Sequence, residues 1–128
     1  MNAVLLDTHV LLWWLQGGSN LSSQARTIVS DPATKALVSA ASAWEIAIKF
    51  KAGKLDAGGL VARFHSILEV NRFLELPVSA THAIKAGLLE GSHRDPFDRM
   101  LVAQAQIENV PIVSNDKMFD RFSVRRLW

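Results

Sequence analysis

The chain has 128 residues, of which 49% are hydrophobic and 20% are charged, and its formal net charge is +2. These values predict a single globular domain over residues 1–128 and exclude a low-complexity or disordered chain. The absence of cysteine gives no support to a disulfide-stabilised secreted domain. The apolar N-terminal stretch has no basic start, and no run reaches the roughly 20 apolar residues that a membrane span needs. We therefore expect a cytoplasmic protein without membrane association.

Short apolar runs alternate with helical periodicities along the whole chain. We expect strands at residues 3–7, 35–39, 73–77, 110–114 and 123–127. Helices are expected at residues 10–15, 22–30, 43–53, 59–70, 79–89 and 96–108, with Ser22 or Ser23, Ser42, Ser79 and Asp95 as candidate N-caps. Strands that alternate with helices predict an α/β domain with a mainly parallel central sheet.

Two acidic residues follow predicted strands. Asp7 ends the first apolar run, and Asp116 follows the fourth strand. In open parallel sheets, ligands bind beyond the carboxyl ends of the strands. Each residue also has a purely structural interpretation, because Asp7 can cap the next helix and Asp116 suits a turn.

Three more acidic residues lie near predicted helix starts. Glu45 lies one turn into its helix and is spaced to pair with Lys49. In the stretch "HRDPFDRM", Asp95 suits an N-cap, and Asp98 falls in the first turn, where the helix dipole favours a negative charge. Each of these acids is ambiguous by itself.

Taken together, at least three acids are predicted at one end of the same sheet. Clustered carboxylates repel one another and need a cation, and oxygen ligands favour Mg²⁺ or Mn²⁺ over zinc. The sequence contains no glycine-rich phosphate loop and no recognisable nucleophile motif. The pattern therefore favours a carboxylate site that holds a divalent cation.

Four motifs occur in order: "LLDTHVLLWWL", "SAASAWEIAIKFKAGKL", "HRDPFDRMLVAQA" and "VSNDKMF". In this order they resemble the PIN-domain ribonucleases, specifically the VapC-like toxins of toxin–antitoxin pairs. The similarity runs from about residue 4 to the C-terminal "RLW". It implies a three-layer α/β/α sandwich with a mainly parallel sheet and a Mg²⁺- or Mn²⁺-dependent endoribonuclease.

The resemblance also implies which residues carry the activity. The four catalytic and metal-binding acids correspond to Asp7, Glu45, Asp98 and Asp116. Thr8 and Ser114 match the hydroxyl residues of the first and last motifs. Asp95 belongs to the third motif, and whether Asp95 or Asp98 contacts the metal directly stays open at this point.

Partners follow from the same resemblance. It implies an RNA substrate, a cognate VapB-like antitoxin and a homodimer. Lys49, Arg94 and Arg99 are candidates for contacts with the RNA backbone. The apolar residues of the first helix exceed what one helix face buries, which suggests that some of them contact the antitoxin; they are Leu11, Leu12, Trp13, Trp14 and Leu15.

Other functions remain as alternatives. A non-catalytic PIN-like module could bind RNA or protein, although a degraded site would not need this full set of acids. A phosphoacceptor role for Asp7 lacks the second acid expected two residues later, where His9 stands. A nuclease for branched DNA would use similar metal chemistry but needs additional structure to grip its substrate.

Overall fold

A computed structural model describes residues 2–128 and shows a five-stranded sheet with the strand order β3-β2-β1-β4-β5. Every neighbouring pair of strands is parallel. The strands are β1 (Asn2–Leu6), β2 (Thr34–Ser39), β3 (Leu74–Leu76), β4 (Ile112–Val113) and β5 (Arg126–Leu127). The predicted parallel sheet is confirmed, and because all strands run the same way, their carboxyl ends share one edge.

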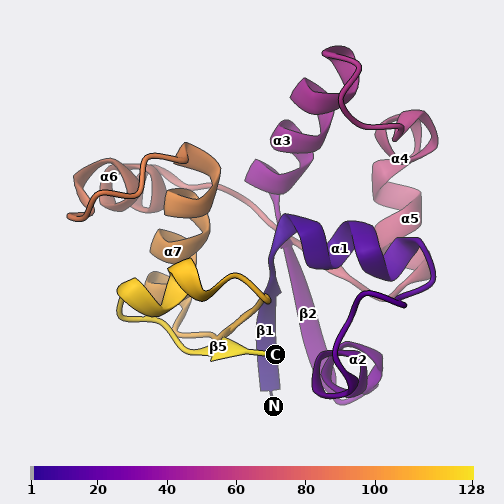
Figure 1. Cartoon of the computed structure of the whole chain (residues 1–128), viewed down its shortest axis with the longest axis horizontal. Coiled ribbons are helices and arrows are strands. Elements are labelled where there is room, and N and C mark those ends of the chain that lie inside the picture. The colour runs from indigo at the N-terminus through magenta and orange to yellow at the C-terminus, as the bar shows by residue number, and fades with distance from the viewer. Residues whose placement is uncertain (1) are drawn as a thin grey trace.

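Helices connect the strands and cover both faces of the sheet, as parallel topology requires. They are α1 (Thr8–Leu15), α2 (Ser23–Ser30), α3 (Ala40–Lys51), α4 (Gly58–Ala62), α5 (Phe64–Val70), α6 (Ala80–Leu88) and α7 (Pro96–Glu108), with a 3₁₀ turn, η1, at Lys117–Arg121. Figure 1 shows α6 and α7 on one side of the sheet and α1, α2, α4 and α5 on the other. The predicted three-layer α/β/α sandwich is therefore confirmed.

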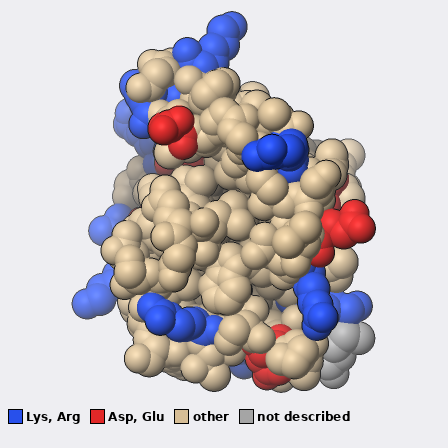
Figure 2. Space-filling view, turned by 90° about the vertical axis from the view of Figure 1, so that its right-hand side faces the viewer, with Lys and Arg blue, Asp and Glu red and all other residues tan. Residues whose placement is uncertain are grey.

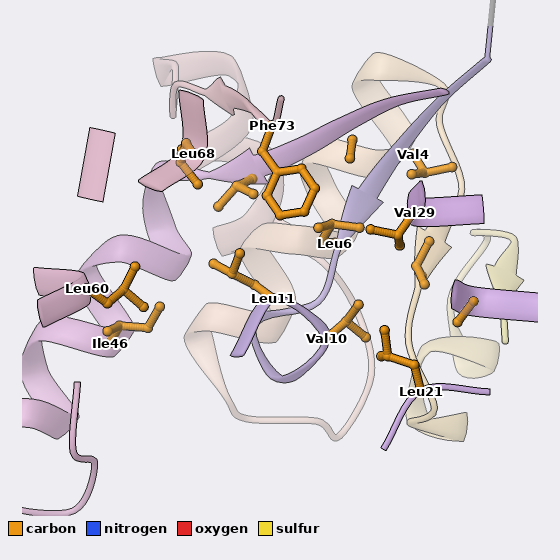
Figure 3. Close-up of a cluster of buried hydrophobic side chains, with 14 of the residues drawn as sticks. Val4, Leu6, Val10, Leu11, Leu21, Val29, Ile46, Leu60, Leu68 and Phe73 are labelled. Atoms are coloured by element: carbon orange, nitrogen blue, oxygen red, sulfur yellow. The ribbon is translucent and has the colours of Figure 1, made fainter. Parts of the chain in front are cut away.

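Alternation along β1 divides the interior into two clusters, because successive side chains of a strand point to opposite faces. Val4 and Leu6 enter a cluster that includes Val10 and Leu11 of α1 (Figure 3). Leu5 enters the opposite cluster, which α7 and η1 complete with Leu101, Val102, Met118 and Phe119. These two clusters fix α1 and α7 on opposite faces of the central strand.

Three predicted local features are wrong in detail. Ser39, not Ser42, caps α3, because β2 leads directly into the helix and the Ser39 hydroxyl accepts a 3.0 Å hydrogen bond from the Ala41 amide. The helix expected at 59–70 is two helices, since Arg63 has non-helical backbone angles of φ −129° and ψ 35°. The last strand is confined to Arg126–Leu127 rather than 123–127.

The apolar run of α1 is also more enclosed than predicted. Leu11 is fully buried, and the other four residues of the run are partly buried against the same cluster; they are Leu12, Trp13, Trp14 and Leu15. The Trp14 indole also donates a 3.0 Å hydrogen bond to the Asn71 side chain. These four residues still keep part of their surface exposed, so the expected antitoxin contact of this run stays a prediction. Across residues 2–128, no helix is long and apolar enough to cross a membrane.

Candidate active site

Asp7 lies at the carboxyl end of β1 and is only 4% exposed. Its Oδ2 accepts a 2.7 Å hydrogen bond from the Ser114 hydroxyl, and its Oδ1 is 4.0 Å from Nδ1 of His9. Asp7 occupies the predicted N-cap position of α1, but within the described part of the chain its side chain makes no capping hydrogen bond. Burial raises the pKa of Asp7 above 3.8, and the Ser114 hydrogen bond opposes that rise.

Ser114 and Asp116 follow β4, which is the strand beside β1. The fully buried Ser114 hydroxyl accepts a 3.0 Å hydrogen bond from the Asp116 amide while it donates to Asp7. One oxygen of Asp116 accepts from the Met118 amide at 2.9 Å and so caps η1. The predicted turn role of Asp116 is confirmed, and its carboxylate lies on the same edge of the sheet as Asp7.

Glu45 comes from α3, the helix that follows β2. It is 5% exposed, and its Oε2 accepts a 2.7 Å hydrogen bond from the Lys49 ammonium. The predicted pairing with Lys49 is confirmed. The hydrogen bond to Glu45 raises the pKa of Lys49, and the negative charges of Asp95 and Asp98 add to this rise to a smaller extent.

A polar contact connects the start of α1 to α3. The buried hydroxyls of Thr8 and Ser42 are 2.8 Å apart and share a hydrogen bond. This contact holds the residue after Asp7 against the helix turn that precedes Glu45. Sequence reasoning missed Ser42 as a partner of Thr8, because the two residues lie far apart in the chain and no local pattern connects them.

Asp95 and Asp98 are at the start of α7. Oδ1 of Asp95 accepts hydrogen bonds from the amides of Phe97 at 2.9 Å and Asp98 at 3.3 Å, which confirms the predicted N-cap. Oδ2 of Asp98 is 2.9 Å from Nε2 of His93. Burial raises the pKa of Asp98 to about 6; the His93 hydrogen bond opposes this, and the charges of Asp95 and Asp7 add to it.

Two basic residues, His93 in the loop before α7 and Arg99 in α7, hold this loop in place. Arg99 donates a 2.8 Å hydrogen bond from Nη1 to the carbonyl oxygen of His93. His93 therefore contacts Asp98 through its ring and Arg99 through its backbone. The contact between His93 and Asp98 is visible only in the structure. Arg94 is exposed.

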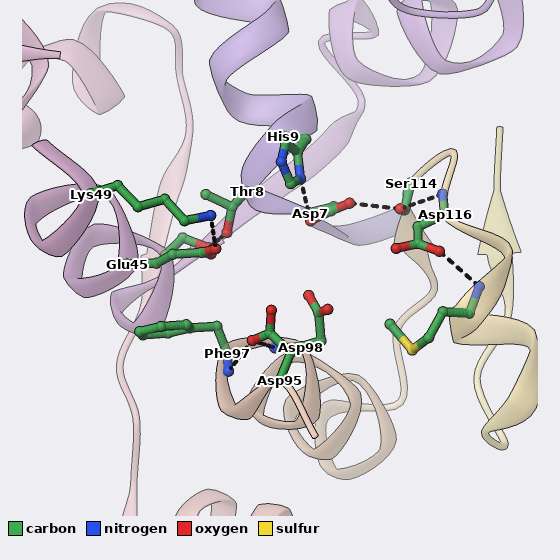
Figure 4. Close-up of polar contacts among 12 residues, drawn as sticks. Asp7, Thr8, His9, Glu45, Lys49, Asp95, Phe97, Asp98, Ser114 and Asp116 are labelled. Atoms are coloured by element: carbon green, nitrogen blue, oxygen red, sulfur yellow. Dashed lines mark hydrogen bonds and ion pairs between the residues drawn. The ribbon is translucent and has the colours of Figure 1, made fainter. Parts of the chain in front are cut away.

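The acidic side chains face one common space. Figure 4 shows Asp95 and Asp98 of α7 pointing toward Asp7 and Glu45, with Asp116 on the far side of Asp7. The negative charge of Asp7 raises the pKa of Asp98, and that of Glu45 raises the pKa of Asp7, as neighbouring carboxylates do. The structure thus brings together all four acids proposed as ligands, together with Asp95.

The donor set suits a hard cation, since it consists of carboxylate oxygens. The spacing is wider than a coordination shell: within residues 2–128, no three acidic, histidine or cysteine side chains are close enough to hold a metal ion as they stand. Lys49 and His93 contact two of the carboxylates in this arrangement. The chemistry of the residues therefore fits Mg²⁺ or Mn²⁺, while the carboxylates face each other without closing on a single point.

The fold and site together define an α/β protein with an acidic centre at the carboxyl edge of a parallel sheet. The family model of the PIN domain matches residues 4–124, so the chain belongs to the PIN-domain family. A search of the curated proteins found no significant match.

Solved structures show the same fold. A chain of the VapBC2 complex from Rickettsia felis, bound to a promoter DNA fragment, superposes with a TM-score of 0.70 at 15% identity, covering 97% of this chain and 96% of that one. VapBC-1 from nontypeable Haemophilus influenzae gives the same TM-score, identity and coverage. The PIN-domain endonuclease Utp24 matches at a TM-score of 0.52 and 18% identity, covering 93% of this chain and 74% of its own.

Proposed function

We propose that this PIN-domain protein is a metal-dependent endoribonuclease that acts as the toxin of a toxin–antitoxin pair. One observation carries the proposal: five carboxylates from β1, α3, α7 and the β4–η1 connection face a common space. Burial raises the pKa of Asp7 and of Asp98. Keeping these buried carboxylates ionised costs free energy unless a cation balances the charge, and a bound proton is the alternative. A phosphodiester hydrolase needs such a centre to bind the cations that stabilise charge on a phosphate.

Asp7, Glu45, Asp98 and Asp116 are the residues that would hold one or two Mg²⁺ ions, or Mn²⁺, and Asp95 is the alternative to Asp98. When bound, the ions would supply positive charge at the scissile phosphate and acidify a water molecule. Ser114 restrains the Asp7 carboxylate through its hydrogen bond, and Thr8 and Ser42 keep the end of β1 against α3.

The basic residues around the site have distinct roles in this proposal. Lys49 neutralises part of the carboxylate charge through its 2.7 Å contact with Glu45, and the His93 ring lies 2.9 Å from Asp98. Arg94 is exposed and free to meet an RNA phosphate, and Arg99 keeps further donors beyond the one bound to His93. Arg94 and Arg99 are therefore proposed contacts to the RNA backbone. Lys49 is the third, because its side chain is 42% exposed and its ammonium keeps donors beyond the one bound to Glu45.

We further propose that a VapB-like antitoxin binds this chain and that the chain forms a homodimer. The structural neighbours include toxin–antitoxin complexes, which supports an antitoxin partner. An excess of buried carboxylates attracts a basic side chain of such a partner by the same charge argument that favours a metal. The face over α1, α2, α4 and α5 has a broad uncharged centre with charged side chains of both signs at its edges, and it is the surface proposed for the antitoxin (Figure 2).

Cleavage of total cellular RNA by the purified, antitoxin-free protein tests the proposal. We expect cleavage with Mg²⁺ or Mn²⁺ and none with excess chelator. Asp7→Asn should reduce the rate by at least about 100-fold, since it removes a buried ligand charge. Asp56→Asn is the matched control, because Asp56 is an exposed acid outside the site, and it should keep full activity.

A non-catalytic PIN-like module that binds RNA or protein is the competing function. It predicts that the folded, metal-loaded wild type cleaves no class of RNA, while RNA or a partner still binds. That result would overturn the nuclease proposal.

A further inference from the structure

A hollow of about 480 Å³ lies between α3, α6 and the start of α7, beside the acidic centre. Its walls include Trp44, Phe97 and Met100, and two arginines, Arg94 and Arg99, also line it. The volume falls within the range of small-ligand sites, which are mostly apolar with a few polar groups. The proposed function gives no role to the apolar walls of this hollow, although Arg94 and Arg99 are proposed RNA contacts.

An aromatic pair forms one wall of the hollow. The rings of Trp44 and Phe97 meet edge to face, with centroids 5.2 Å apart and an interplanar angle of 75°. This geometry leaves Trp44 64% exposed, although an indole is among the costliest side chains to leave in water. A flat, apolar partner that covers the Trp44 ring would remove that cost.

The same two residues connect the hollow to the acidic centre. Trp44 directly precedes Glu45 on α3, and Phe97 directly precedes Asp98 on α7. Figure 4 shows Phe97 beside Asp95 and Asp98, below Glu45. A molecule in the hollow would therefore contact two residues that are the sequence neighbours of Glu45 and Asp98, two of the proposed metal ligands.

The charges around the hollow select among occupants. Both arginines line the hollow, but its surface is mostly apolar and one Arg99 nitrogen binds the His93 carbonyl oxygen. Arg94 is exposed, so it is the cation that an occupant can reach, and a purely apolar peptide would leave it unused. A nucleotide matches both features, because its base stacks on aromatic rings and its phosphate pairs with arginine. Proteins recognise single-stranded RNA in this way, by bases that are unstacked onto aromatic side chains and arginine.

We propose that this hollow is a nucleotide subsite, which holds one unpaired base of the RNA against Trp44 and Phe97 while Arg94 binds an adjacent phosphate. The proposal rests on the proposed nuclease function for the path of the RNA from the hollow to the carboxylates. The binding of a base in the hollow does not depend on cleavage. It predicts a preference for single-stranded over duplex RNA, since a paired base cannot enter the hollow.

Binding of a fluorescein-labelled, mixed-sequence 10-nucleotide RNA tests the subsite, measured by anisotropy with chelator present so that cleavage does not interfere. Trp44→Ala should weaken binding by about 5- to 100-fold, the usual effect of losing one stacking platform. Trp44→Phe, which keeps a ring, should recover most of the affinity. Leu88→Ala is the matched control, because Leu88 is an exposed apolar side chain on α6 outside the hollow, and it should bind like the wild type. Circular dichroism checks that each variant is folded.

Two outcomes would overturn the subsite. In one, the wild type fails to bind the RNA, or Trp44→Ala binds it as tightly as the wild type does. In the other, Trp44→Ala leaves RNA affinity unchanged but converts a dimer to a monomer in sedimentation, or abolishes antitoxin binding, which would assign the hollow to a protein partner.

Cleavage assayed in parallel separates this proposal from the proposed function. A protein that binds RNA through Trp44 but cuts none retains the subsite and loses the nuclease. A protein that cuts RNA with an unchanged KM after Trp44→Ala retains the nuclease and loses the subsite.

Discussion

The hydroxyl of Ser114 donates a 2.7 Å hydrogen bond to Asp7, a residue 107 positions away in the chain. The bond crosses from β4 to the end of β1, the central strand of the sheet, and both side chains are buried. It is the contact that orients the most buried acid of the candidate active site.

Replacing Ser114 with alanine should therefore affect both stability and the site. We expect the variant to lose about 1–3 kcal/mol of unfolding free energy, because a buried carboxylate loses a charged hydrogen bond. The pKa of Asp7 should rise further, since the Ser114 bond opposes the effect of burial. Urea unfolding and carboxyl ¹³C NMR of the metal-free protein measure these effects. Ser123→Ala, at an exposed serine, is the control; equal Asp7 titration in both variants would contradict the prediction.

The stability of the metal-free protein should fall as the pH rises from about 4 to 6. The folded pKa of Asp98 is about 6 against 3.8 when unfolded, so the folded state holds its proton over this interval while the unfolded state releases it. The stabilisation that proton binding at Asp98 gives the folded state is fully present below pH 4 and is lost above pH 6. Asp7, whose pKa is also raised, acts in the same direction.

Asp98→Asn tests this pH dependence in the presence of chelator. At pH 7 the variant should be more stable than the wild type by about 1–2 kcal/mol, a value reduced for the partial exposure of Asp98. At pH 4 the two proteins should unfold at the same urea concentration. A constant difference at both pH values would show that Asp98 does not cause the slope.

Lys49→Gln should tighten Mg²⁺ binding. The Lys49 ammonium contacts Glu45 at 2.7 Å, so it competes with a metal ion for that oxygen and repels it. Removal of this charge should lower the Mg²⁺ dissociation constant roughly tenfold, about 1.4 kcal/mol. Isothermal titration calorimetry measures the constant. Lys51→Gln, an exposed lysine on the same helix, should bind Mg²⁺ like the wild type, and weaker binding by the Lys49 variant would contradict the argument.

His82→Ala should destabilise the contact between α6 and α7. His82 is 4% exposed; its Nδ1 accepts from the Ser79 amide in a capping box, and its Nε2 lies 2.9 Å from Glu108. Loss of the cap and of buried volume should cost about 2 kcal/mol or more. Thermal and urea unfolding measure the loss. His65→Ala, at an exposed histidine, should change the stability little; an equal effect of both would show that the buried network is not the cause.

Contacts between near neighbours could be predicted from the sequence. The Asp95 cap of α7, the Ser79 cap of α6 and the pair of Glu45 with Lys49 all join residues two to four positions apart. Such contacts depend on helix geometry, which the residue types and their spacing already specify. The position of Asp7 and Asp116 after strands could be predicted for a similar reason, since apolar runs mark the strands.

Contacts between distant residues could not be predicted in the same way. The bonds from Thr8 to Ser42, from Ser114 to Asp7 and from His82 to Glu108 depend on which helix packs on which strand. The break at Arg63 was missed because one non-helical residue barely changes the spacing of apolar side chains around it. Ser42 was assigned a cap because the exact end of β2 is decided by its pairing with β1 and β3.

The sequence by itself determined a parallel α/β domain, the acids at strand ends and helix starts, and the resemblance to PIN-domain ribonucleases. These properties follow from hydrophobic periodicity and from local motifs, which need no knowledge of the folded chain. Only the tertiary structure decided that five acids share one space, that His93 contacts Asp98, and that the exposed Trp44 packs against Phe97 in the wall of a hollow beside them. The reason is that charge repulsion, burial and ring contact depend on distances in space, and the order of strands in the sheet sets those distances.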